Sequence, residues 1–362
     1  MNSRGNEVVA GVGAAALTRS DITLELGTHH PSTHGSLRLR LVLDGDTVVS
    51  GEPLVGALHR GAEKLFEVRD YRQVLVLANR HDWLAAFNNE VGVALAVERM
   101  LGMEVPARAT WLRTLLCEVN RVLSHLMFLG HLDRRFVALR EPLQAVLEEA
   151  TGGRIHVVCT RVGGLLEDVP LGWGDRVRTA VQTVREALGE VPLDALAGLG
   201  VLSVADALAY GVSGPVARGS GLDVDLRRDD PYLAYGDLDV PVVLRTEGDA
   251  AARFACLVEQ VGVSLDLVEQ CLARLPSGPV NVKLPKTVRA PEGSTYSWTE
   301  APSGVAGYYL VSRGAATPWR LAMRTASFNN VSALPAVLPG LRVQDLPAVL
   351  ASFFFVVGDV DR

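Results

Sequence analysis

Three of the eight histidines of this chain lie within a six-residue stretch, from His29 to His34, that also contains Pro31. Near neutral pH a histidine donates hydrogen bonds or protons, and its neutral ring binds metal ions. Pro31 excludes a helix through the stretch, so His30 and His34 are not the helical i, i+4 pair of a zinc protease. We expect these imidazoles on a rigid loop. There they either contact a ligand or hydrogen-bond the local backbone, and the residues alone support both interpretations.

A metal site on this loop would need a carboxylate or a further ligand at a defined spacing, and none is evident. The four cysteines lie far apart, with no Cys-x-x-Cys pair among them. Neither a disulfide framework nor an iron–sulfur motif is therefore predicted. A Walker A sequence and a G-x-G-x-x-G after a strand are also missing, which leaves nucleotide binding without support.

A second group of chemically active side chains is the tetrapeptide Arg80-His81-Asp82-Trp83, just before a helix expected over 85–101. Asp82 could cap that helix while Trp83 packs against it. The alternative is that these side chains line a cavity as a polar cluster.

The elements that must position these residues follow from periodicity. Leucines at every second position over 37–43, followed by Asp44-Gly45, predict a hairpin with strands near 36–43 and 47–51. The histidine loop therefore leads into a strand. Further elements are helices over 107–129, 142–150, 175–190 and 250–275, an irregular connection over 215–249, and strands over 307–312 and 319–323.

The helix expected over 107–129 carries an apolar stripe of leucines and valines. Glu118, Arg121 and His125 share another face of the same helix, because they are spaced by three and four residues. They form either a solvated edge or a buried polar network.

Composition describes a globular chain on the apolar side of average, since 48% of its 362 residues are hydrophobic and 21% are charged. A net charge of −6 without a basic tract argues against nucleic acid as the main partner. The mean hydropathy is +0.21, yet no apolar run is long enough for a transmembrane helix, so we expect broad contact with protein partners. The first twenty residues lack the pattern of a signal peptide, which predicts a cytoplasmic location.

Together these elements predict an α+β, mostly helical fold: a helical bundle with small N-terminal and C-terminal β-sheets. We expect a flexible arm over 1–20 and a single domain over 21–362. That domain comprises an N-terminal β-hairpin region over 21–56, a helical core over 57–280 and a C-terminal α/β region over 281–362.

Seven short motifs, taken in order, resemble the D-subunit (49 kDa-type) family of proton-pumping NADH–quinone oxidoreductase, respiratory complex I, which is related to the large subunit of nickel–iron hydrogenases. The resemblance extends from about residue 21 to the last residue. The motifs are His30-Pro31-Ser32-Thr33-His34-Gly35, Gly56-Ala57-Leu58-His59-Arg60-Gly61-Ala62-Glu63-Lys64, Ala96-Val97-Glu98-Arg99-Met100-Leu101-Gly102, Glu118-Val119-Asn120-Arg121, Arg161-Val162-Gly163-Gly164, Arg218-Gly219-Ser220-Gly221 and Gly358-Asp359-Val360-Asp361-Arg362.

The resemblance implies a hydrogenase-like fold whose metal site is lost, because the two Cys-x-x-Cys pairs of hydrogenases are absent. In the complex I family the vacated cavity receives the quinone headgroup. The histidine that matches His34 donates to a quinone carbonyl there, with His30 close by. Arg80 and His156 match family residues beside the terminal iron–sulfur cluster of the neighbouring B subunit.

The same resemblance implies partners and cofactors. Quinone would be the substrate, and this chain would bind no metal or cluster of its own. The iron–sulfur clusters, FMN and NADH would belong to partner subunits. The chain would dock against the B, C, H and I subunits of complex I, peripherally, on the cytoplasmic side of the cell membrane.

Several positions depart from the family pattern. The family has a tyrosine as second quinone ligand where this chain has Trp83, after Asp82. An indole N–H donates a hydrogen bond but does not release a proton at any relevant pH, whereas a phenol can. A helix-forming block near Arg289 is missing, and Phe353-Phe354-Phe355 replaces a Leu-Asp-Pro pattern, which removes a carboxylate. Asp133 is the position that would match the aspartate paired with the family's histidine.

Two functions are compatible with these features. In the first, the chain is the quinone-binding subunit of a proton-translocating NADH–quinone oxidoreductase. His34, His30, Trp83 and Asp82 then form the catalytic set, with Arg80 and His156 near the cluster of the B subunit. The alternative is a non-catalytic structural paralogue that scaffolds the B subunit in a partial or variant assembly. The retained histidines and Arg80 favour the first, and Trp83 favours the second.

Overall fold

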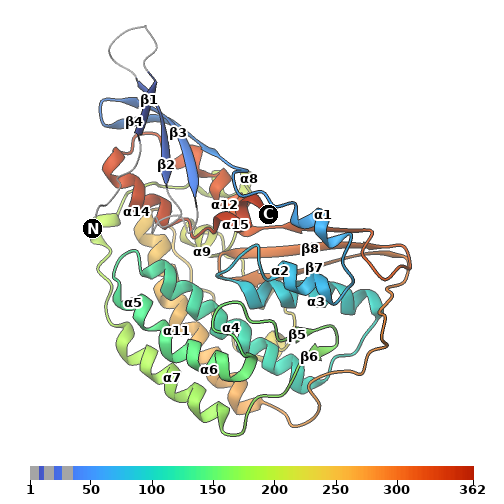
Figure 1. Ribbon diagram of the computed structural model, residues 1–362. Coiled ribbons are helices and arrows are strands. Elements are labelled where there is room, and N and C mark those ends of the chain that lie inside the picture. The colour runs from blue at the N-terminus through green and yellow to red at the C-terminus, as the bar shows by residue number, and fades with distance from the viewer. Residues whose placement is uncertain (1–7, 12–19, 27–35) are drawn as a thin grey trace, which may run out of the picture.

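The computed structural model describes residues 8–11, 20–26 and 36–362, and these residues form a helical bundle with small antiparallel sheets (Figure 1). The fold is α+β and mostly helical, as predicted. The strands are β1 (Val8–Gly11), β2 (Ser20–Leu26), β3 (Leu37–Asp44), β4 (Thr47–Leu54), β5 (Thr160–Arg161), β6 (Gly164–Leu165), β7 (Gly293–Ala301), β8 (Gly304–Ser312) and β9 (Arg320–Arg324).

The first sheet has the order β1-β2-β3-β4 and contains the predicted hairpin. Leucines of β3 point into the core at alternate positions, while the residues between them are mostly exposed. The turn lies one residue later than expected, because Asp44 pairs with Thr47 and leaves Gly45 and Asp46 to make the turn. Gly45 adopts a φ of 63°, in the left-handed region that favours glycine.

All five helices predicted from the sequence are present, over 85–101, 107–129, 142–150, 175–190 and 250–275. The ends of each helix lie within two residues of the predicted bounds. They are α1 (Ala62–Phe66), α2 (Gln73–Ala78), α3 (Ala86–Leu101), α4 (Ala107–Leu129), α5 (Arg135–Ala138), α6 (Arg140–Thr151), α7 (Trp173–Leu188), α8 (Val204–Ala209), α9 (Gly214–Gly219), α10 (Leu226–Asp229), α11 (Ala250–Arg274), α12 (Ala326–Ser332), α13 (Leu334–Val337), α14 (Leu346–Ala351) and α15 (Val357–Asp361).

The long helices α4, α6, α7 and α11 pack side by side, and α3 lies between this bundle and the β7-β8-β9 sheet (Figure 1). The α4 helix follows Pro106, which is tolerated at a helix start, and ends at Gly130. The side chain of Asp249 caps α11 by accepting a hydrogen bond from the backbone N–H of Ala252 at 2.8 Å. Burial of the apolar faces of these helices forms the main core.

The polar face of α4 is a buried network and not a solvated edge. Glu118, Arg121 and His125 are fully buried. Arg121 Nε and Arg227 Nη1 lie 3.2 and 3.0 Å from Glu118 Oε2, and the hydroxyl of Tyr235 donates to Glu118 Oε1 at 2.5 Å. Burial alone would raise the pKa of Glu118, but the two arginines lower it to about 2.

The network continues from α4 to β7 through a second set of buried charges. Arg227 also pairs with Asp225 at 2.8 Å, and Arg218 bridges Asp225 at 3.3 Å and Glu300 at 2.8 Å. Three buried arginines therefore face three buried carboxylates, which joins α4, α10 and β7 without a surplus charge. Such a network is sensitive to the loss of any one member, because the partner is then buried unpaired.

Within the described residues, no helix is both long enough and apolar enough to cross a membrane. The four cysteines are free and buried.

The network generates a pH-dependent prediction for Glu118→Gln. We expect the variant to lose about 3–5 kcal/mol in free energy of unfolding at about pH 6, because Arg121 and Arg227 lose their shared anion. The contribution of the Glu118 charge is complete above the unfolded pKa of 4.5 and is lost as pH falls toward about 2. The difference from wild type should therefore shrink over that range in chemical denaturation of the purified chain.

The control is Asp266→Asn, which removes an exposed partner of Arg185 and should cost at most about 1 kcal/mol. A destabilisation by Glu118→Gln that does not change with pH would contradict the assignment.

Candidate functional site

The tetrapeptide singled out in the sequence forms the turn between α2 and α3, and Asp82 fixes its shape. Oδ1 of Asp82 accepts hydrogen bonds from the backbone N–H groups of Leu84 at 3.0 Å and Ala85 at 3.1 Å. The expected capping role of Asp82 is not borne out, because α3 begins after Ala85 without a side-chain cap, and Asp82 instead fixes the turn that precedes the helix. His81 and Asp82 are buried, Trp83 is half-buried and Arg80 is exposed. The turn therefore combines an exposed cation, Arg80, with the buried polar side chains of His81 and Asp82.

The C-terminal helix α15 packs directly against this turn. A Cβ atom added at Gly358 would lie 2.3 Å from a ring carbon of Trp83 and 2.5 Å from the backbone oxygen of His81. Only a residue without a side chain allows this approach. The contact places Asp359, the next residue of α15, beside His81 and Asp82.

A buried line of hydrogen bonds runs from α15 through the turn to the C-terminal sheet. His81 Nδ1 lies 2.8 Å from Asp359 Oδ1, and His81 Nε2 lies 3.2 Å from the hydroxyl oxygen of Tyr308. The Tyr308 hydroxyl in turn donates to Asn89 Oδ1 at 3.0 Å. His81 thus links α15, β8 and α3 through one ring.

The two carboxylates near the turn have opposite electrostatic surroundings. Burial and the negative charge of Asp359 raise the pKa of Asp82 well above its usual range. Burial also disfavours the charged form of Asp359, but His81 and Ser327 hydrogen-bond it and hold its pKa below the usual value. A proton therefore resides on Asp82 more readily than on Asp359.

The opposite side of the turn carries His156. Its Nδ1 lies 2.9 Å from Oδ1 of Asn79, the residue that ends α2. Asn79 Nδ2 also donates to Glu90 Oε1 at 2.6 Å, and burial raises the pKa of Glu90 to about 8. Burial and the nearby Arg80 lower the pKa of His156. The side chain of Arg80 is exposed and close enough to act on His156, so the structure brings these two predicted residues together.

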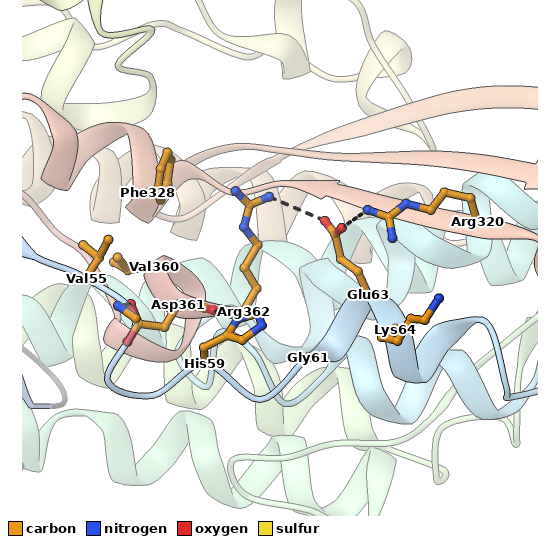
Figure 2. A pocket seen from close by; sticks show the side chains of 11 residues that line it. Val55, His59, Gly61, Glu63, Lys64, Arg320, Phe328, Val360, Asp361 and Arg362 are labelled. Carbon is orange, nitrogen blue, oxygen red and sulfur yellow. Dashed lines mark hydrogen bonds and ion pairs between the residues drawn. The ribbon is translucent and has the colours of Figure 1, made fainter.

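A pocket of about 490 Å³ lies on the other face of α15 (Figure 2). The carboxylate of Asp361 accepts from the backbone N–H groups of Gly56 and Leu58, each at 2.7 Å, and ties the loop after β4 to the C-terminus. Glu63 pairs with Arg320 and lies 3.5 Å from Arg362, as the dashed lines in Figure 2 mark. In these ion pairs, most of the charged side chains that line the pocket are already paired with one another.

His30 and His34 lie outside the described residues. The stretch that contains them is bounded by Leu26 and Leu37, which pair with each other across β2 and β3. Arg38, next to Leu37, pairs with Leu54 at the end of β4, which leads directly to the pocket loop at Gly56.

Two further positions were singled out in the sequence: Asp133 and the Phe353-Phe354-Phe355 segment. Asp133 is exposed and pairs with Arg135 at 3.2 Å. Phe354 packs edge-on against Phe128 and Phe254 with ring centroids 5.4 Å apart, so the Phe353-Phe354-Phe355 segment belongs to the apolar core. Within the described residues, no group of three or more histidines, cysteines or acidic residues is placed to hold a metal ion.

The comparisons with known proteins agree with this architecture. A family model described as "Respiratory-chain NADH dehydrogenase, 49 Kd subunit" matches residues 134–289 and 283–362. The chain belongs to this family. It is 60% identical to the D 2 subunit of NADH-quinone oxidoreductase from Salinispora tropica over 98% of this chain and 97% of that protein. It is 56% identical to the D 1 subunit from Streptomyces coelicolor, with 98% and 99% covered.

More distant members of the 49 kDa subunit family also match nearly end to end. The D 2 subunit from Koribacter versatilis is 38% identical, over 94% of this chain and 96% of that protein. Among solved structures, a chain of the membrane-bound sulfane sulfur reductase, an archaeal respiratory membrane complex, matches with a TM-score of 0.89 and 32% identity. The match covers 95% of this chain and 99% of that one. The chain is thus a member of a family of oxidoreductase subunits.

Sequence reasoning about this 49 kDa-family chain missed the roles of His81, Asp359 and Tyr308. The signal for His81 and Asp359 was present, because both stand in segments that were singled out. What the sequence did not reveal is that residues 278 positions apart share one hydrogen bond.

The packing of α15 predicts the effect of Gly358→Ala. The new Cβ would overlap the Trp83 ring and the His81 carbonyl, so the turn must move, and we expect a loss of about 1–3 kcal/mol in stability. The matched control is Gly262→Ala on α11, where no atom lies within 4 Å of the added Cβ. That variant should be neutral or gain up to about 1 kcal/mol. Denaturation midpoints measure both, and equal behaviour of the two variants would contradict the contact.

Proposed function

We propose that this chain is the quinone-binding subunit of a proton-translocating NADH–quinone oxidoreductase of the complex I type. In this function it forms, with a B subunit, the site where electrons from the terminal iron–sulfur cluster reduce quinone. The observation that carries the proposal is the gathering of Arg80, Asp82, Trp83 and His156 around the α2–α3 turn. The relatives that are named as D subunits of NADH-quinone oxidoreductase support it.

One side of the turn suits an electron donor held by a partner. Arg80 is exposed, and its side chain has no hydrogen-bond partner within the described residues, so its charge is available to a neighbouring subunit. His156 lies beside it. A cation close to an iron–sulfur cluster stabilises the reduced, more negative state and raises the reduction potential of the cluster.

The other side of the turn suits a quinone headgroup. The ring of Trp83 rests on Gly358, and its Nε1–H has no hydrogen-bond partner within the described part of the chain. This N–H can donate to one carbonyl oxygen of a quinone. His34, with His30 close to it, is the proposed donor to the other carbonyl. Such donors stabilise the negative charge that develops on the oxygens during reduction.

The remaining parts of the reaction belong to partners in this proposal. The B, C, H and I subunits surround the chain, and iron–sulfur clusters, FMN and NADH are held by partner subunits. The chain associates peripherally with the cytoplasmic side of the cell membrane through those partners. Quinone is its substrate, and the free energy of quinone reduction drives proton transfer elsewhere in the complex.

The test of the quinone site is inhibitor-sensitive quinone reduction by the purified complex that contains this chain. We expect His34→Ala to abolish most of the activity, because one of two carbonyl donors is lost, and Trp83→Tyr to retain it. A wild-type complex that is inactive but is activated by Trp83→Tyr would instead indicate a dormant, structural paralogue. Unchanged activity in His34→Ala would contradict the proposed role of that residue.

A separate prediction concerns the electron donor. Arg80→Gln removes a cation from the proposed cluster interface, so the midpoint potential of the terminal cluster should become more negative in an EPR-monitored redox titration. Arg178→Gln is the control, because Arg178 is exposed on α7 and pairs only locally with Asp175. An identical potential in wild type and Arg80→Gln would place Arg80 away from the cluster.

A further inference from the structure

We propose that the Asp82 carboxyl is the source of one of the two protons delivered to quinone, and that His81 and Asp359 are the positioning residues that keep this proton on Asp82. The inference rests on the proposed function and answers a chemical question that it leaves open. With an indole at position 83, the turn lacks the phenolic proton that a tyrosine would offer.

The geometry brings two carboxylates together behind Trp83. The backbone of α15 touches the turn at Gly358, which lies against the Trp83 ring and the His81 carbonyl. Asp82 and Asp359 therefore approach each other from opposite elements, and both are buried. Two neighbouring carboxylates in a buried site do not both ionise, so one of them holds a proton.

The hydrogen bonds of Asp82 and Asp359 determine which of the two carboxylates holds the proton. Asp359 accepts from the His81 ring at 2.8 Å through Oδ1 and from the backbone N–H of Ser327 at 3.0 Å through Oδ2, so both oxygens are stabilised as an anion. Asp82 accepts only through Oδ1, from Leu84 and Ala85, and its Oδ2 has no partner within the described residues. The direction of the pKa of each group agrees, raised for Asp82 and lowered for Asp359.

The surrounding groups support the same charge state. Because the Tyr308 hydroxyl donates to Asn89, its oxygen accepts from His81 Nε2. The His81 ring thus connects Asp359 on one side with Tyr308 on the other. Arg324 of β9 is a cation near Asp359, and Tyr308 is the other titratable group near Asp82. A protonated Asp82 adds no second negative charge beside Asp359.

The proton balance of the step is simple. Quinone takes two electrons from the cluster of the partner subunit and two protons to become quinol. The O–H bond of Asp82 breaks, an O–H bond forms on one quinone oxygen, and Asp82 becomes a carboxylate that solvent later reprotonates. The second proton comes from solvent. The negative charge left on Asp82 beside Asp359 is unfavourable and drives its reprotonation from solvent.

The test compares three variants in the intact complex, measured as quinone reduction against pH. Asp82→Asn retains an Oδ1 acceptor for the backbone N–H groups of Leu84 and Ala85 but has no carboxyl proton to give, so we expect a loss of about 100-fold, the usual scale of general acid catalysis. Asp359→Asn removes the charge that holds the proton on Asp82. The fall in activity at alkaline pH, where Asp82 loses its proton, should then occur at lower pH than in wild type.

Asp249→Asn is the matched control, because Asp249 is also a buried aspartate that accepts backbone N–H groups, here at the start of α11 in a different part of the fold. Its rate and pH profile should equal those of wild type. A second readout does not depend on turnover: near neutral pH the infrared C=O absorption of protonated carboxylic acids should be weaker in Asp82→Asn than in wild type and Asp249→Asn, with Glu90 contributing the same band in all three.

The outcomes distinguish the proton role of Asp82 from the proposed function in quinone reduction. If wild type reduces quinone and Asp82→Asn keeps its rate and pH profile, Asp82 is not the proton source and the quinone site still stands. If wild type does not reduce quinone, the proposed function fails, and the proton role of Asp82 fails with it. If Asp82→Asn does not assemble, the Asp359→Asn profile decides: a shift to lower pH supports the inference, and an unchanged profile overturns it.

Discussion

The contact between Gly358 and the α2–α3 turn is the constraint on which the candidate site depends. A residue with any side chain at position 358 would push α15 away from Trp83. With glycine there, Asp359 reaches His81, and the adjacent Asp361 binds the loop after β4. The C-terminus therefore holds together three segments that are distant in the sequence: the end of the first sheet, the α2–α3 turn and the C-terminal sheet.

The α2–α3 turn contacts two sets of functional side chains, which lie in different directions from it. Arg80 and His156 lie toward one side, where a positive charge can act on an electron donor in a partner. Asp82, His81 and Asp359 lie toward the other, where protons are held in a buried set. In the proposed function, electrons and protons must arrive at one quinone headgroup. The turn, which Asp82 fixes through the backbone N–H groups of Leu84 and Ala85, carries the residues proposed for both tasks.

The buried network of α4 gives the rest of the fold its rigidity. Arg121 and Arg227 share Glu118, and Arg218 extends the same network to Glu300 on β7. Because every charge has a partner of opposite sign, helices from the middle of the chain are fixed in relation to the C-terminal sheet. The platform on which the turn and α15 meet is thus set by electrostatic pairing as well as by the apolar core.

The sequence predicted features that depend on local pattern. The alternating leucines of β3 and the stripe of α4 specify their structures by spacing alone, whereas Asp82 fixes the turn before α3 and does not cap the helix as predicted. Strand β7 was missed, because its polar sequence lacks a clear alternation; it pairs with β8 along its full length and packs on α3.

The pairing of His81 with Asp359 and of Arg227 with Glu118 arises only when distant segments meet, so no local pattern could reveal it. The environment of His156 likewise depends on Asn79 and Arg80, which are separated from it in the sequence by the helices α3 to α6.

The most direct test of the central claim is a structure of the assembled complex with a short-chain quinone bound. The account predicts that one carbonyl oxygen of the headgroup lies within hydrogen-bond distance of Trp83 Nε1, on the side of the turn that faces α15. A headgroup bound away from residues 80–83, with the Trp83 ring buried against another subunit, would contradict it.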